Sequence, residues 1–304
     1  MRRFLVVLAV LVLAACETVP ITGRQQVSLI SDAEIGSQAA AAFADFVDES
    51  DVVDGTAEAR MVTRVGRRIQ RAVEDYFTQQ GQAERLAGYD WEYVLVDSEE
   101  INAFCMPGGK VAVYTGILPV AETEQGLAVV MGHEVAHAVA NHGNERMSQA
   151  MLAEAAGALV VGLLAGDDDD SVGSGLLQAA FGLGAQVGVL LPFSRLHESE
   201  ADRLGMIFMA MAGYDPREAP RFWQRMAAAG GGGGDGLEFL STHPSDSTRV
   251  RELDAAMAEA LAYHRGDPAE GEAEETAPAS GGGWIGVPEM KTRKKGSAGT
   301  GTRS

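Results

Sequence analysis

Three residues with the means to do chemistry stand close together at His133, Glu134 and His137. Residues four apart in a helix lie about 40° apart around its axis, so the two imidazoles face one point. Neutral imidazoles in this arrangement suit a tetrahedral zinc ion. Glu134 is turned about 100° from His133, so its carboxylate can reach a water at the metal without binding the metal. The pattern predicts a zinc hydrolase with Glu134 as the general base.

The sequence around these residues is apolar on every side. A helix is predicted over residues 123–141, and Leu127, Val130 and Val139 lie on different faces of it. The alternative, two solvated histidines on an exposed helix, does not fit this pattern. Histidines in a buried helix need polar partners, because burying a polar group without one is costly. A bound metal supplies such a partner.

A third ligand has to come from elsewhere in the chain. Some zinc proteases place a further histidine six residues after the second one, but here that position is Gly143. His142 is five residues after His137 and about 140° away around a helix, so it is expected to point elsewhere. A structural role at the helix end, where a cation is favoured, is expected for His142.

The acidic residues Glu198, Glu200 and Asp202 are the best candidates for the missing ligand. Glu198 and Asp202 are four residues apart on a helix predicted over 197–211, so they share a face. One of them can bind the metal while the other accepts the remaining N–H of a ligand histidine. Glu200 is an open alternative as the ligand, and a solvated helix face is the alternative for all three residues.

These residues belong to a larger set of motifs that resembles one zinc metallopeptidase family. This family includes the CAAX prenyl protease, HtpX and the soluble proteins of the BepA and LoiP type, and the resemblance extends over residues 31–264. The lack of a convincing set of spanning helices makes the chain similar to the soluble lipoprotein branch. The matching segments are Asn102–Gly109, Val111–Leu118, Gly132–Ala138, Glu198–Gly205 and Thr242–Arg249.

The resemblance implies a gluzincin that holds one Zn²⁺ per chain. His133, His137 and Glu198 are then the metal ligands. Glu134 is then the catalytic base, and Asp202 orients a ligand histidine from outside the metal's own shell.

The resemblance also implies roles for two residues near the C-terminal end of the matched region, His243 and Arg249. In BepA-like members, the histidine of the His-Pro segment can approach the zinc and block the site. His243 is therefore a candidate regulatory fourth ligand. Arg249 is expected near the site, and either Arg249 or His243 is expected to stabilise the oxyanion during catalysis.

Periodicity and capping residues predict an α+β, mostly helical fold: a zincin-like metalloprotease domain with a small β-sheet beside the helix of His133. Ser31 and Thr56 are expected to cap two of the helices. Helices are predicted over residues 31–47, 56–81, 123–141, 151–165, 176–191 and 197–211, and from about 215 and 245 onwards. Strands are predicted over residues 91–96, 103–106 and 110–115.

Two segments have more than one interpretation. The strand at 110–115 is either an internal core strand or an edge to which extended substrate adds, and the family resemblance favours the edge. Residues 151–191 are apolar and glycine-rich and are split by four aspartates. They form buried helices, a lid or a membrane-contacting hairpin, with buried helices favoured.

The first residues resemble a bacterial lipoprotein signal. A basic start precedes an apolar run that is too short to cross a membrane, and the sequence Leu-Ala-Ala-Cys then ends at Cys16. The resemblance implies cleavage before Cys16 and acylation of that residue. Residues 1–15 are therefore expected to be a signal peptide and residues 16–30 a tether. The expected location is the bacterial cell envelope, with the anchor in the outer membrane and the protein facing the periplasm.

Composition sets the remaining limits. The 304 residues carry 24 Lys+Arg against 43 Asp+Glu, a net charge of −19, so the surface repels phosphate and no nucleic-acid partner is expected. Two cysteines exclude a disulfide framework. Residues 31–265 are expected to form one metallopeptidase domain, and residues 266–304, rich in Pro, Gly and Glu, a disordered tail.

The residues and the resemblance together predict a zinc-dependent endopeptidase of the bacterial envelope. Its expected partners are misfolded or unassembled envelope polypeptides, and it is expected to reach the membrane through its lipid anchor. The alternative is an envelope chaperone or assembly factor whose zinc site is blocked by His243. A purely structural lipoprotein is disfavoured by the intact histidine motif.

Overall fold

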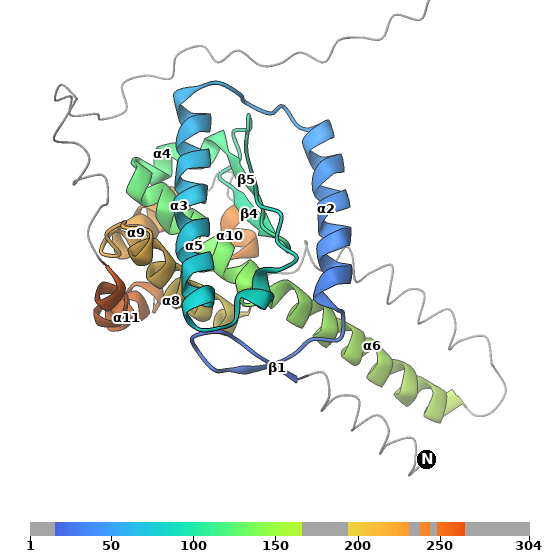
Figure 1. The fold of residues 1–304 in the computed structure, drawn as a ribbon. Helices are drawn as coiled ribbons and strands as arrows, with labels where there is room; N and C mark the ends of the chain where they lie inside the picture. The colour runs from blue at the N-terminus through green and yellow to red at the C-terminus, as the bar shows by residue number, and fades with distance from the viewer. Residues whose placement is uncertain (1–15, 166–193, 231–237, 244–247, 265–304) are drawn as a thin grey trace, which may run out of the picture.

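The computed structural model describes residues 16–165, 194–230, 238–243 and 248–264. The fold is α+β and mostly helical, as predicted (Figure 1). The helices are α2 (Asp32–Glu49), α3 (Ala57–Gln79), α4 (Leu118–Ala121), α5 (Glu124–Val139), α6 (His142–Ala165), α8 (Arg195–Met211), α9 (Glu218–Gly230), α10 (Glu238–Thr242) and α11 (Arg249–Tyr263). The strands are β1 (Cys16–Thr18), β2 (Gln25–Val27), β3 (Glu92–Val96), β4 (Ala103–Met106) and β5 (Lys110–Tyr114).

The three-stranded sheet has the order β3-β5-β4. β5 pairs with β3 in parallel and with β4 antiparallel. Gly108 and Gly109 turn the chain between β4 and β5 with φ angles of 83° and 84°, a conformation that glycine adopts at little cost. The prediction that the strand at 110–115 is an edge is therefore wrong, because β5 pairs with β4 on one side and with β3 on the other. β3 and β4 are the two outer strands; β3 makes one further bridge, between Val96 and Val52, and β4 pairs with no other strand among the described residues.

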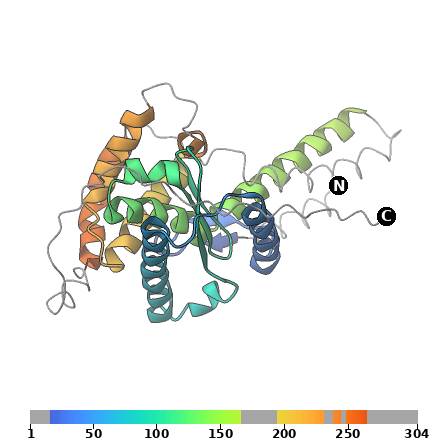
Figure 2. The ribbon, with the colours of Figure 1, turned by 90° about the horizontal axis from the view of Figure 1, so that it is seen from above.

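The sheet lies between helices on both faces (Figure 2). On one face, Phe43 of α2 packs with Val94, Val96 and Ala112. On the other face, Leu95, Val111 and Val113 join the large core that α3, α5, α8 and α9 build. Successive side chains along a strand point to opposite faces of the sheet. Alternate residues of β3 and β5 therefore pack against α2 on one face and join the large core on the other.

Helix α5 is the centre of the larger core. Thr123 caps its first turn by accepting a hydrogen bond from the Gly126 backbone N–H at 3.2 Å. Every residue from Gly126 to Val139 is buried. The prediction of a helix that is apolar on all sides is confirmed, and the site that it carries is enclosed by neighbouring helices.

α5 and α8 approach each other so closely that two glycines are required. A Cβ atom added to Gly132 would lie 2.9 Å from the carbonyl oxygen of Gly205. A Cβ atom added to Gly205 would lie 2.9 Å from the backbone nitrogen of His133. This backbone contact sets the distance between the histidines of α5 and the acidic residues of α8.

Residues 16–30, which were expected to be a tether, are folded onto the body of the protein. β1 and β2 form an antiparallel hairpin in which Cys16 is paired with Val27. Val19 is 1% exposed and belongs to the core, and the Leu29 backbone N–H donates to Ser148 Oγ at 2.9 Å. The contacts that hold this segment come from residues distant in the sequence, so no local pattern reveals them.

Several expectations fall on residues outside the described part of the chain. These are the signal peptide at 1–15, the helix at 176–191 and the disordered tail at 266–304. The helix expected over 151–165 is the second part of the longer α6. Among the described residues, no helix combines the length and the apolar character needed to cross a bilayer.

The close contact between α5 and α8 predicts that adding a methyl group destabilises the protein at Gly205 but not at Gly36. Gly205→Ala is expected to lower the free energy of unfolding by about 1–3 kcal/mol, because the new Cβ forces two backbones apart. Gly36→Ala in α2 is the control, since its Cβ would meet nothing within 4 Å and helical alanine is favoured by about 0.5–1 kcal/mol. Urea unfolding measures both. Equal stability of the two variants would contradict the close approach.

Candidate metal centre

Helix α5 presents the two histidines of the motif side by side. Nε2 of His133 lies 3.1 Å from Nε2 of His137, and both side chains are almost fully buried. Their spacing of four residues places them on consecutive turns of one face, as predicted. The two nitrogens therefore define a point at which α8 and the segment after α10 meet α5.

Helix α8 brings two acidic residues to this point. Glu198 Oε1 lies 3.3 Å from His137 Nε2, and Glu198 Oε2 lies 3.5 Å from His133 Nε2. Asp202, one turn later, lies on the far side of the first ring, with Oδ1 2.9 Å from His133 Nδ1. The structure thus brings together both carboxylates that the sequence predicted.

His243 completes the group from the end of α10. Its Nδ1 lies 3.3 Å from His133 Nε2 and 3.0 Å from Glu198 Oε1. One ligand-type atom from each of four buried residues lies within 4.8 Å of the others: His133, His137, Glu198 and His243. Three nitrogens and one carboxylate oxygen form a donor set that suits zinc in tetrahedral geometry.

The hydrogen-bond pattern shows that the donor set fits a cation. Asp202 accepts from His133 Nδ1, so Nε2 of this ring presents a lone pair once the ring is neutral. His142 Nδ1 lies 3.0 Å from His137 Nδ1, and His142 Nε2 lies 3.0 Å from Glu200. Since His142 donates from Nε2 to the Glu200 carboxylate, its Nδ1 is an acceptor. His137 therefore donates from Nδ1 and presents a lone pair at Nε2. Two lone pairs 3.1 Å apart repel each other unless a proton or a metal ion lies between them.

Burial and charge shift the titration of these groups in different directions. Burial opposes charge on His133, but hydrogen bonds to Asp202 and Glu198 outweigh it and raise its pKa to about 9. Burial lowers the pKa of His137 and raises the pKa of Glu134. Burial also works against charge on Glu198, yet hydrogen bonds from three histidines hold the pKa of its carboxyl far below the usual range.

Arg249 lies near the site, as expected, and its contacts are with the acidic residues of α8. Its guanidinium pairs with Glu198 Oε2 at 3.1 Å and with Asp202 Oδ2 at 2.7 Å, and it lies 3.2 Å above the Trp223 ring. It lines a hollow between α8 and α11 and is not among the residues that line the cleft beside Glu134. The structure therefore gives Arg249 the task of holding the two carboxylates in place.

Glu134 opens onto a cleft of about 330 Å³. Its Oε1 is buried and accepts no hydrogen bond from any residue that the structure describes, and His243 Nε2 lies 3.5 Å from it. The free edge of β4 and the aromatic rings of Phe46 and Tyr114 line the same cleft. A carboxylate with an open acceptor, facing a cleft and adjoining the donor set, is placed to take a proton.

The expectation that His142 points away from the site is wrong, and the open alternative of Glu200 as the ligand is not supported. His142 contacts His137, because α5 ends at Val139 and Asn141 adopts a left-handed conformation with φ 60°, which turns the chain back. Glu200, the alternative ligand, is absent from the donor set and pairs with His142 and Arg24. Burial lowers the pKa of His142 to about 4, so this ring is neutral at pH 7.

The fold and the donor set are those of a zincin-like peptidase domain, and comparison with known proteins agrees. The family described as Peptidase family M48 matches residues 64–257. This match covers more than half of the chain and includes the four residues of the donor set. The chain belongs to peptidase family M48.

Individual relatives share this part of the chain. Identity is 42% over 170 residues with the mitochondrial metalloendopeptidase OMA1 of Schizosaccharomyces pombe, covering 56% of this chain and 48% of the relative. It is 35% over 175 residues with the human mitochondrial metalloendopeptidase OMA1, covering 57% and 33%. It is 30% over 166 residues with a putative beta-barrel assembly-enhancing protease of Vibrio cholerae, covering 53% and 33%. The chain thus spans half or less of these relatives.

The expected location is contradicted by these relatives. Proteins from two yeasts, a plant and several vertebrates that match the chain are named as mitochondrial, which points away from a bacterial outer-membrane lipoprotein anchored at Cys16. A basic start followed by a short apolar run is a pattern of local composition, and it specifies a compartment less well than it specifies export. In the structure, Cys16 is the first residue of β1.

The raised pKa of His133 predicts that metal binding depends on pH. A ligand histidine has to be neutral, so binding below pH about 9 displaces one proton from this ring. The affinity for zinc is expected to rise about tenfold per pH unit from pH 7 to about 9 and then to level off. Calorimetry in two buffers of different ionisation enthalpy counts the released proton. Binding at pH 7 without proton release would contradict the assignment.

Proposed function

We propose that the protein is a zinc-dependent endopeptidase that cleaves extended segments of unfolded or unassembled polypeptides. The observation that carries the proposal is the buried group of His133, His137 and Glu198 beside the carboxylate of Glu134, whose Oε1 has no hydrogen-bond partner among the described residues. His243 holds the fourth position of this group, and a catalytic zinc site needs that position for water, so the reaction requires the His243 ring to move away. Membership of peptidase family M48 supports the same chemistry. When bound, zinc supplies Lewis-acid chemistry at this point, polarising a carbonyl and acidifying water.

The residues of the chain divide the remaining tasks. Glu134 takes the proton from the attacking water and delivers it to the leaving amine, a role that its raised pKa favours. Asp202 and His142 each hold one ligand histidine through Nδ1, which keeps Nε2 of both rings directed at the metal. Arg249 neutralises the two carboxylates of α8 and keeps them in position.

The edge of β4 supports the choice of substrate. An extended peptide can add to this free edge as a further strand, with its main chain held next to Glu134. Phe46, Phe104 and Tyr114 form one apolar wall of the cleft and suit large apolar side chains. A folded protein rarely offers a free extended segment, so this geometry selects chains that are not folded.

Replacement of the general base tests the proposal directly. Glu134→Gln keeps the size of the side chain but cannot take a proton, so hydrolysis of an unfolded protein is expected to fall about 10²–10⁴-fold. Zinc content should be unchanged, because Glu134 is not in the donor set. A gel assay with an unfolded substrate, together with metal analysis of both proteins, measures the two quantities. Full activity in the variant would refute the proposed role.

A second function is favoured by the position of His243. This ring contacts Glu198 and lies near Glu134, so it occupies the space between the metal ligands and the base. A site closed in this way would leave an unfolded polypeptide bound along β4 without cleavage. The protein would then act as a chaperone or an assembly factor.

Removal of the His243 ring separates the two functions. His243→Ala is expected to raise kcat/KM for an unfolded substrate several-fold, because it clears the space in front of Glu134. Zinc affinity should fall modestly, because one of four donors is lost. If the variant and the parent protein both suppress aggregation and neither cleaves, the chaperone is the better description. A loss of cleavage at full zinc loading would instead assign His243 to the oxyanion.

A further inference from the structure

A second buried cluster of titratable side chains lies behind the metal centre. His142, Glu145, His197 and Glu200 are all less than 10% exposed and come from α6 and α8. His142 Nε2 lies 3.0 Å from Glu200 Oε2, and His197 Nε2 lies 2.9 Å from Glu145 Oε2. None of these four side chains belongs to the donor set, and the proposed reaction leaves Glu145 and His197 without a task.

Arg24 joins the two halves of this cluster. Its Nε donates to Glu200 Oε2 at 2.7 Å, while Nη1 and Nη2 donate to the two oxygens of Glu145 at 2.9 and 2.7 Å. Thr22 Oγ1 donates a further hydrogen bond to Glu200. One guanidinium thus compensates two buried carboxylates, which would otherwise repel each other at high cost.

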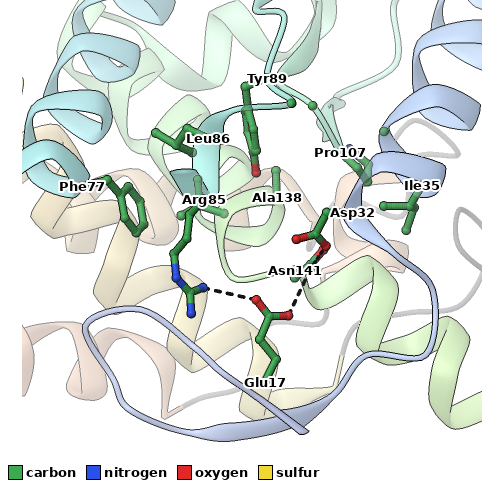
Figure 3. Close-up of a pocket in the computed structure, with 14 residues that line it drawn as sticks. Glu17, Asp32, Ile35, Phe77, Arg85, Leu86, Tyr89, Pro107, Ala138 and Asn141 are labelled. Atoms are coloured by element: carbon green, nitrogen blue, oxygen red, sulfur yellow. Dashed lines mark hydrogen bonds and ion pairs between the residues drawn. The ribbon is translucent and has the colours of Figure 1, made fainter. Parts of the chain in front are cut away.

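The hairpin of β1 and β2 places Arg24. The Val19 backbone N–H donates to Arg24 O at 2.8 Å, and the Gly23 N–H donates to Val19 O at 3.0 Å, so the turn before Arg24 is fixed. At the start of the hairpin, Glu17 contacts Arg85 and Asn141, the residue that precedes α6 (Figure 3). Contacts at the start of the hairpin and hydrogen bonds within its turn thus place Arg24 beside Glu145 and Glu200.

We propose that the hairpin over residues 16–27 is a positioning clamp for the metal ligand His137. Arg24 fixes Glu200, Glu200 fixes the His142 ring, and His142 accepts the Nδ1–H of His137. The proposal rests on the metal centre proposed above. It assigns to a segment more than 100 residues away in sequence the control of one ligand's orientation.

The clamp explains why His142 needs a partner. His142 is the first residue of α6 and follows Asn141, whose φ is 60°. The His142 ring stacks on the His197 ring and contacts Glu200 and His137 through its two nitrogens. With Glu200 held by Arg24, the ring keeps its accepting nitrogen toward His137; with Glu200 released, both rings can rotate away.

Zinc affinity of the full chain tests the proposal without an activity assay. Losing a group that is bonded directly to a ligand histidine typically weakens metal binding about 10–100-fold, and Arg24 acts through two intervening residues, so Arg24→Gln is expected to weaken zinc binding by up to about tenfold. Arg24→Lys keeps the positive charge but loses the several N–H groups with which the guanidinium reaches both carboxylates, so its zinc affinity should lie between those of the parent protein and Arg24→Gln. Competition with a chelator measures affinity, and the visible spectrum of the cobalt(II)-loaded protein reports the ligand geometry, which a general loss of stability does not alter.

Three further variants make the result specific. Arg203→Gln removes a comparable two-bond pair between α8 and α11, with Glu259, and should leave zinc affinity and the cobalt(II) spectrum unchanged. Thr22→Val removes only one bond to Glu200 and should have a smaller effect than Arg24→Gln, which covers the case that Arg24→Gln does not fold. Arg24→Gln combined with His142→Gln should cost less than the product of the two single losses, because both act through one chain of contacts.

The outcomes separate the clamp from the metal centre. If the parent protein binds zinc and Arg24→Gln and Thr22→Val bind it equally well with an unchanged cobalt(II) spectrum, the clamp is refuted and the metal centre stands. If Arg203→Gln weakens binding as much as Arg24→Gln, or the effects of Arg24→Gln and His142→Gln multiply independently, the clamp is also refuted. If the parent protein binds no zinc, both proposals fail.

Discussion

The close contact between α5 and α8 is the constraint on which the site depends. Because Gly132 and Gly205 have no side chains, the two backbones approach until a Cβ on either would collide. Only at this distance can short carboxylate side chains of one helix reach imidazoles of the other. The buried convergence of like-charged or electron-rich groups is unfavourable by itself, and a cation at their centre turns the same arrangement into a stable one.

The local sequence predicts much of the site, and the features that it does not predict depend on contacts between residues far apart in the chain. The spacing of His133 and His137 predicts their shared face, and the spacing of Glu198 and Asp202 predicts that one carboxylate enters the donor set while the other orients a ring. The central position of β5 was not predictable, because it depends on which strand pairs with its second side. The approach of His142 depends on one residue, Asn141, that leaves the helical conformation.

Contacts outside the donor set account for a large part of the buried charge. Arg249 compensates the carboxylates on one side of the centre, and Arg24 compensates those on the other. The second of these comes from a segment whose composition suggested a simple linker. Local composition did not reveal its role because its partners, Glu145 and Glu200, lie on α6 and α8. In this chain, buried ion pairs thus join the segment of residues 16–30 to the helices that carry the metal centre.

The most direct test of the account is X-ray absorption at the zinc edge of the purified protein. Four nitrogen and oxygen neighbours at about 2.0–2.1 Å are predicted, with the outer-shell scattering of the His133 and His137 imidazoles and, when His243 closes the site, of a third imidazole. A sulfur neighbour at about 2.3 Å would instead place Cys105, which lines the cleft beside Glu134, at the metal. That result, or a protein that takes up no zinc at all, would contradict the central claim.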